Sequence, residues 1–136
     1  MLKLMYITNR PEVAAIAADA GVDRIFLDME VLGKAQRQGG MDTVQSHHVP
    51  GDIARVRAAI GRRAEIMARV NPLNPNSQAE INASVENGAD VIMLPMWRTA
   101  DDLRQLVSIV NGRAKVMPLL ETDDAVRNLP EALTVP

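Results

Sequence analysis

The sequence predicts an α/β fold built from parallel strands, and three features point to that class. Five short apolar runs alternate with amphipathic segments along the 136 residues. The runs are continuously apolar rather than alternating, which is typical of strands buried on both faces. Gly21-Val22-Asp23 precedes the second run as Gly88-Ala89-Asp90 precedes the fourth. Strands that alternate with helices in this way form a parallel sheet with right-handed crossovers.

The first half of the chain predicts two strands with a helix after each. The apolar run 2–7 is followed by Pro11 at a first helical position, and apolar residues recur at helical spacing until Gly21. The second run, residues 24–29, is bounded by charged residues. A long polar segment follows it, and a helix then begins at Asp52 with its apolar side chains on one face.

The second half of the chain repeats the pattern. Ser77 and Glu80 have the spacing of a capping box, in which two side chains satisfy free backbone N–H groups at a helix start. Thr99 is a second candidate cap, and a glycine follows each of these two helices. The last strand leads into a short helix that Pro130 interrupts. The strands predicted in this half span residues 65–70, 91–94 and 115–120.

Two parallel folds fit five strand–helix units. A five-stranded doubly wound sheet is complete at 136 residues, whereas a (β/α)₈ barrel typically needs about 250. The glycine-rich phosphate loop of dinucleotide-binding sheets is absent, because Thr8-Asn9-Arg10-Pro11 follows the first strand. In either case we expect residues 1–136 to form one domain.

The composition argues against several classes of function. The net charge is −2 and no basic block or aromatic platform occurs, so no nucleic-acid partner is expected. No apolar run approaches the roughly 20 residues of a membrane helix, and the N-terminus lacks the pattern of a signal peptide. Cysteine is absent, which excludes disulfides and thiol nucleophiles. We therefore expect a cytoplasmic protein that does not associate with membranes.

Charged residues gather where the predicted strands end. Asp28 and Glu30 close the second strand, Arg69 lies at the end of the third, and Glu121 follows the fifth. In either parallel fold these ends meet at one edge of the sheet, where function gathers. Carboxylates are hard ligands for Mg²⁺ or Mn²⁺, and arginine binds a carboxylate or enolate oxygen through two hydrogen bonds. Such a set suits a divalent ion that holds a small oxyacid.

These four residues also have ordinary structural explanations. Asp28 and Glu30 are able to cap the following turn, Arg69 to form a structural ion pair, and Glu121 to occupy the first turn of a helix. Each signal is weak alone, and the shared location is what favours a site.

The histidines and the tryptophan are weaker candidates. His47 and His48 are adjacent in the long polar segment, where we expect a solvated loop rather than a pair of metal ligands. Trp97 follows the fourth strand, and we expect it to pack rather than to stack on a substrate.

Four stretches of the sequence resemble one known family, in order and with suitable spacing. They look like the second to fifth strands of the HpcH/HpaI aldolase and citrate lyase beta-subunit family, and the match covers nearly the whole chain. The resemblance implies a (β/α)₈ TIM barrel, of which this chain carries the first five βα units with parallel strands. The stretches are residues 20–30 with Phe26-Leu27-Asp28-Met29-Glu30, then Ala68-Arg69-Val70-Asn71, residues 87–96 with Met93-Leu94-Pro95-Met96, and Leu119-Leu120-Glu121-Thr122.

The resemblance implies a role for each candidate residue. The family binds Mg²⁺ or a similar ion, and it makes or breaks carbon–carbon bonds next to pyruvate-like 2-oxo acids or acyl thioesters. Glu121 would be a metal ligand, and Arg69 would hold the substrate carboxylate or enolate oxygen. Asp28 and Glu30 would lie at the acid–base end of the site, and Pro95 would contact the substrate.

The sequence departs from the family pattern at two places. Val31 stands where the aldolase branch has a histidine and the lyase branch has an acid, although Lys34 and Arg37 loosely resemble basic residues of the lyase branch. The second metal-binding carboxylate of the family follows strand six, where this chain stops at Pro136. We therefore expect an incomplete barrel: a fragment, in preference to a chain completed by a partner or by self-association.

Three functions follow as hypotheses. The first is a metal-dependent aldolase or lyase acting on an oxo acid through an enolate. The second is a non-catalytic module that oligomerises through its open sheet edges, and the third is a doubly wound domain that binds a small anion. Exposed edges and an exposed apolar face lead us to expect a homo-oligomer.

Overall fold

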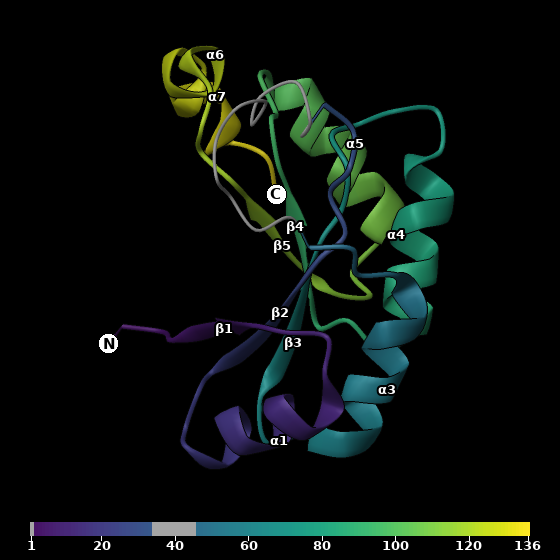
Figure 1. Ribbon diagram of the computed structural model, residues 1–136. Coiled ribbons are helices and arrows are strands. Elements are labelled where there is room, and N and C mark those ends of the chain that lie inside the picture. Colours follow the sequence, from purple (N-terminus) through teal and green to yellow (C-terminus); the bar gives the residue numbers. More distant parts are fainter. Residues whose placement is uncertain (1, 34–45) are drawn as a thin grey trace.

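The computed structural model describes residues 2–33 and 46–136, and a five-stranded parallel sheet forms its centre (Figure 1). The strands lie in sequence order, and each pairs in parallel with the next. They are β1 (Met5–Ile7), β2 (Arg24–Asp28), β3 (Glu65–Arg69), β4 (Val91–Leu94) and β5 (Lys115–Pro118). The helices are α1 (Pro11–Asp19), α3 (Pro50–Ile60), α4 (Ser77–Glu86), α5 (Ala100–Val110), α6 (Asp123–Arg127) and α7 (Leu129–Ala132).

The strand order distinguishes between the two predicted folds. A doubly wound sheet reverses its order at a switch point and carries helices on both faces. Here the order β1-β2-β3-β4-β5 never reverses, and α3, α4 and α5 lie in a row along one side of the sheet (Figure 1). The partial barrel is therefore confirmed and the doubly wound alternative is wrong. The barrel is not closed, because β1 and β5 are the edges of the sheet.

The main hydrophobic core lies between the sheet and its helices. Alternate strand residues face the helices, and those of the central strands are almost fully buried, as are Val56 and Ile60 of α3 and Leu106 of α5. Branched aliphatic residues at these positions suit a pleated surface that packs against helices. The sheet residues of this layer are Ile25, Leu27, Ile66, Ala68, Ile92 and Leu94.

A second, smaller cluster covers the opposite face of the sheet. Met67, Val91 and Met93 are buried there, and Phe26 and Met117 pack beside them. In a closed barrel these positions would point inward. Long, flexible methionines are suited to the irregular space on the inner side of an open sheet.

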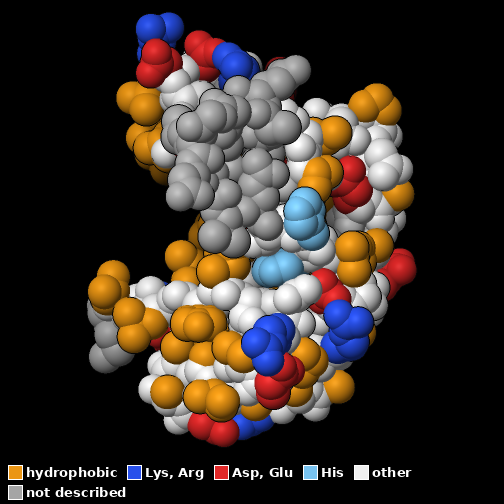
Figure 2. Space-filling model, in the orientation of Figure 1, with side chains coloured by type: hydrophobic (Ala, Val, Ile, Leu, Met, Phe, Trp, Pro, Cys, Tyr) orange, Lys and Arg blue, Asp and Glu red, His pale blue; other side chains and the backbone are white. Residues whose placement is uncertain are grey.

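The edge strand β1 leaves much of its apolar surface uncovered. Met5, Tyr6 and Ile7 are each close to half exposed, at 49%, 47% and 48%. Figure 2 shows hydrophobic side chains gathered around this N-terminal part of the chain. An uncovered apolar edge strand is a surface onto which another strand can pair.

Most predicted element boundaries agree with the structure to within a few residues. The first strand is shorter than predicted, since it begins at Met5 rather than at residue 2. Helix α3 begins at Pro50, two residues before the predicted start at Asp52. The Asp52 carboxylate accepts a hydrogen bond from the Val49 backbone N–H and therefore lies inside the first turn of the helix. None of the described helices is long and apolar enough to cross a lipid bilayer.

The predicted capping box at Ser77 and Glu80 is wrong. Helix α4 has no side-chain cap at its first residue. The Glu80 carboxylate instead accepts hydrogen bonds from the Asn71 side chain, at 3.1 Å, and from Asn74. These two asparagines, together with the Asn71 backbone N–H at 3.4 Å, take the place of the backbone donor expected in a capping box. By contrast, Thr99 caps α5 as predicted, by accepting from the Asp102 backbone N–H.

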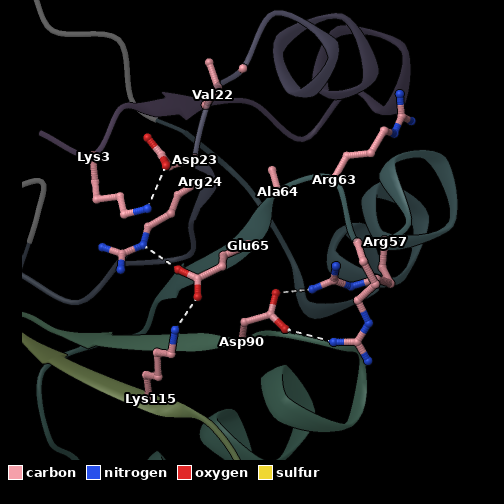
Figure 3. A pocket seen from close by; sticks show the side chains of 12 residues that line it. Lys3, Val22, Asp23, Arg24, Arg57, Arg63, Ala64, Glu65, Asp90 and Lys115 are labelled. Carbon is pink, nitrogen blue, oxygen red and sulfur yellow. Dashed lines mark hydrogen bonds and ion pairs between the residues drawn. The ribbon is translucent and has the colours of Figure 1, made fainter. Parts of the chain in front are cut away.

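A cavity of about 480 Å³ opens at the end of the sheet where the strands begin (Figure 3). The Glu65 carboxylate accepts a hydrogen bond from Arg24 Nε at 2.9 Å and pairs with Lys115. Asp90 pairs with Arg57 in the same region. The amino-terminal end of a barrel generally serves stability rather than catalysis, and we interpret these ion pairs in that way.

Glu65 should therefore make the stability of the protein depend on pH. The hydrogen bond from Lys115, and secondly that from Arg24, lowers the pKa of Glu65 below its ordinary value. A lowered pKa means that the stabilisation is present above the unfolded pKa, about 4.3, and is lost as the pH falls through the lower folded value. We expect Glu65→Gln to lower the free energy of unfolding at pH 7 by less than about 1 kcal/mol, since the side chain is partly exposed.

Urea unfolding of both proteins at pH 7 and at pH 3 measures this effect. The difference in free energy of unfolding between wild type and Glu65→Gln should be smaller at pH 3 than at pH 7. The control Glu86→Gln, at an exposed position, should unfold like wild type at both pH values. An equal difference at the two pH values would contradict a stabilising role of the Glu65 carboxylate.

Candidate functional site

The carboxyl ends of β2 and β3 bring Asp28 and Arg69 together. These residues are the last of their strands and are register partners in the parallel pairing. Arg69 Nε donates to Asp28 Oδ1 at 2.8 Å, and Arg69 Nη2 donates to Asp28 Oδ2 at 2.8 Å. This two-pronged contact fixes the plane of the guanidinium group.

The acidic side of this contact is deeply buried. Asp28 and Glu30 are each only 2% exposed, while the Arg69 side chain is 18% exposed. Glu30 Oε2 lies 3.5 Å from Arg69 Nε. The guanidinium carbon also lies 5.6 Å from the centre of the Phe26 ring, within the range of a cation–π contact. Two buried carboxylates and one arginine form the core of the candidate site.

The neighbouring carboxylates raise the pKa of Arg69. The hydrogen bonds to Asp28 raise the pKa of Arg69 above its ordinary value, although burial opposes them, and the charges of Asp28, Glu30 and Glu121 add to the increase. Glu121 thus faces the same group as the two buried acids. The arginine is permanently positive, and it pairs with both buried carboxylates.

Glu121 lies just after β5 and is held by the neighbouring strand. Its Oε1 accepts a hydrogen bond from the Met96 backbone N–H at 2.9 Å. Met96 has a φ of 55°, a left-handed conformation that is unusual for a residue other than glycine. Strained backbone of this kind gathers at functional sites.

Pro95 and Trp97 flank Met96, and all three line a cavity of about 460 Å³ with residues that follow β2, β3 and β4. Both Pro95 and Trp97 are buried. Trp97 belongs to the main core, as predicted, and its Nε1 has no hydrogen-bond partner in the described part of the chain. A substrate role for Pro95 stays a prediction.

Sequence reasoning missed the part played by Asn71 and His48. The Asn71 side-chain oxygen accepts the backbone N–H groups of Val31 and Leu32, each at 2.8 Å, and so holds the chain after Glu30. His48 Nδ1 accepts the Asp28 backbone N–H at 2.9 Å. For Asn71 a signal existed, since it directly follows the third strand at the functional edge.

The expectation of a solvated histidine loop is half correct. His47 is exposed, whereas His48 is partly buried and hydrogen-bonded to the end of β2. Both histidine side chains reach the face of the molecule shown in Figure 2 (pale blue). Lys34 and Arg37, the basic residues linked to the lyase branch, lie outside the described residues.

The site offers some of the donors that a magnesium ion requires. Within residues 2–33 and 46–136, no three acidic or histidine side chains come together as a metal-binding group. Asp28 and Glu30 are engaged with Arg69. Glu121 uses only Oε1, and Oε2 has no hydrogen bond to the described residues. Because Mg²⁺ is often bound through one or two carboxylates plus substrate and water oxygens, Glu121 fits as one ligand of such an ion.

Comparison with known proteins identifies the family of the chain. The profile of the HpcH/HpaI aldolase/citrate lyase family matches residues 3–136. No curated protein matches the sequence significantly.

Solved structures agree with the fold. The HpcH/HpaI aldolase from Desulfitobacterium hafniense DCB-2 is 16% identical with a TM-score of 0.68, over 98% of this chain and 58% of that protein. A family protein from Burkholderia cenocepacia J2315 is 17% identical with a TM-score of 0.75, over 98% and 60%. A citrate synthase variant is 12% identical with a TM-score of 0.67, over 98% and 54%.

The solved structures establish the fold of the chain, and the sequence profile establishes its family. The chain spans between 54% and 60% of the length of the three solved structures. At these identities the structural likeness shows the fold alone. The family assignment rests on the sequence profile, which covers almost the entire sequence, and this chain therefore belongs to the HpcH/HpaI aldolase/citrate lyase family.

Proposed function

We propose that the protein takes part in metal-dependent cleavage or formation of a carbon–carbon bond in a pyruvate-like 2-oxo acid or an acyl thioester, through an enolate. The observation that carries the proposal is the orientation of Arg69 by buried Asp28. Two of the five N–H donors of a guanidinium group are used by Asp28. Nη1 donates to none of the described residues, and it is the group that would bind a substrate oxygen.

The chemistry depends on charge that appears during the reaction. When a methyl proton leaves pyruvate, the electron pair moves into the carbonyl group and negative charge develops on its oxygen. A fixed guanidinium group stabilises this charge without having to reorganise. A divalent ion, when bound at Glu121, would supply further positive charge at the same oxygen. Asp28 and Glu30 lie at the acid–base end of the site.

The proposal covers both branches of the family. Val31 occupies the position of the histidine or acid that separates the branches, and it is exposed with its backbone N–H bound to Asn71. Neither branch is therefore favoured by the residue at this position. The solved structures of similar fold include an aldolase and a citrate synthase variant, and both are compatible with enolate chemistry on small carboxylic acids.

Exchange of pyruvate methyl protons for deuterium tests the proposal. Followed by NMR, exchange should occur in the presence of Mn²⁺ and fall by about 100-fold or more in Arg69→Lys, which keeps the charge but loses the planar fork. Arg62→Lys, at the opposite end of the sheet, is the matched control and should exchange like wild type. Absence of exchange in a folded, Mn²⁺-loaded sample would contradict the proposal, as would full activity of Arg69→Lys.

A second candidate function is a non-catalytic module that oligomerises, and the half-exposed β1 edge favours it. In both cases we propose a homo-oligomer. Analytical ultracentrifugation combined with the exchange assay separates the candidates, because the module alone predicts a discrete oligomer without exchange.

A further inference from the structure

His48 contacts the backbone of the candidate site from a distant part of the chain. Its Nδ1 accepts the Asp28 N–H at 2.9 Å, across 20 positions of sequence. His48 lies two residues before α3 begins, outside the strands of the sheet. The hydrogen bond therefore joins the segment that leads into α3 to the last residue of β2.

The contact defines the chemical form of the ring. A ring nitrogen that accepts a hydrogen bond carries no proton, so the proton of the neutral imidazole is on Nε2. In this form the ring is an acceptor toward Asp28. Any side chain that replaces it must also present an acceptor at the position of Nδ1.

A buried carboxylate holds the segment that carries His48. Asp52 is 2% exposed, and its Oδ2 accepts the Val49 backbone N–H at 3.0 Å and the Asn9 side-chain amide at 2.9 Å. Val49 is the residue after His48, so Asp52 ties the backbone beside His48 to the start of α3 and to the loop after β1.

Asp28 is consequently held from two sides. Its backbone N–H is bound by His48, while its carboxylate is bound by Arg69 and by the Glu30 backbone N–H at 3.2 Å. A rotation of the Asp28 peptide would move the carboxylate that orients the Arg69 guanidinium group. The hydrogen bond to His48 opposes such a rotation.

We propose that His48 is a positioning residue of the enolate site, which acts on Arg69 through the backbone and carboxylate of Asp28. This inference rests on the proposed function and names a residue that the family pattern does not assign. Positioning groups act by keeping a catalytic group in its productive geometry, where a misplacement of about 1 Å can lower the rate by about 100-fold.

The first test does not depend on activity. His48→Leu removes the acceptor, whereas the side-chain oxygen of His48→Asn can replace Nδ1, and His47→Leu is the control at the exposed neighbouring position. Hydrogen exchange of the Asp28 amide, measured by NMR, should be about tenfold faster in His48→Leu, and near wild type in the other two variants. An unchanged exchange rate of this amide in His48→Leu would overturn the proposal.

The second test uses the exchange of pyruvate methyl protons. In His48→Leu the maximal rate should fall by about tenfold while the pyruvate concentration for half-maximal rate changes less than about twofold, because Arg69 keeps its charge but loses its alignment. His48→Asn should recover most of the rate. If His48→Asn and His48→Leu lose the rate equally, positioning through Nδ1 is wrong. If wild type shows no methyl exchange, the proposed function fails, and the amide measurement still decides whether His48 holds Asp28.

Discussion

Replacing Arg69 with methionine is expected to lower the free energy of unfolding by about 3–5 kcal/mol. Methionine fills much of the space of the arginine stem but removes the hydrogen bonds and ion pairs that Arg69 makes with Asp28 and Glu30, each 2% exposed. Removing one partner of a buried ion pair is strongly destabilising, because the remaining charge stays out of contact with water.

Urea unfolding at pH 7 measures this prediction, with Arg62→Met as the control. The Arg62 side chain is 88% exposed and lies 3.6 Å from Asp90, so its loss should change the free energy of unfolding by less than about 0.5 kcal/mol. Adding Asp28→Asn to Arg69→Met should recover about 1–2 kcal/mol, since the double variant buries one charge fewer. A loss below about 1 kcal/mol in Arg69→Met would show that Asp28 and Glu30 are compensated by other groups.

The meeting of Asp28 and Arg69 could be predicted from sequence because it follows from topology. Both residues end strands that are adjacent along the chain, and parallel strands place their carboxyl ends at one edge. Along each strand, residues facing the helices alternate with residues on the opposite face of the sheet, because successive side chains of a pleated strand point to opposite sides. The choice of a barrel over a doubly wound sheet could not be made from the strand pattern. It came from the resemblance, and the strand order confirms it.

The missed contacts of Glu80 and His48 involve partners outside their own helix or segment. Glu80 has the spacing of a capping residue, but Asn71 and Asn74 offer it side-chain donors that local reasoning does not include. His48 binds Asp28 across a long polar segment whose path has no sequence signal. The left-handed backbone of Met96 is equally hidden, because methionine has no preference for that conformation.

Removing the Glu121 carboxylate is expected to lower the affinity for Mn²⁺ by about 100-fold or more. Asp28 and Glu30 pair with Arg69, whereas Glu121 does not, and among the described residues only its Oε1 accepts a hydrogen bond, from the Met96 N–H. Glu121→Gln tests the charge with little change in shape, since the amide oxygen can still accept from Met96. Glu121→Ala removes the charge and also leaves the strained Met96 N–H without its acceptor.

Comparison of the two variants separates metal binding from backbone support. Electron paramagnetic resonance of free Mn²⁺ should show an equal loss of affinity in Glu121→Gln and Glu121→Ala if the carboxylate is a ligand, and wild-type affinity in the exposed control Glu86→Gln. If Glu121→Ala loses affinity and Glu121→Gln does not, the residue acts by fixing the loop at Met96. Unchanged affinity in both variants would remove Glu121 from the metal site, and the ligands would then have to come from the other acids around Arg69 or from residues beyond those described.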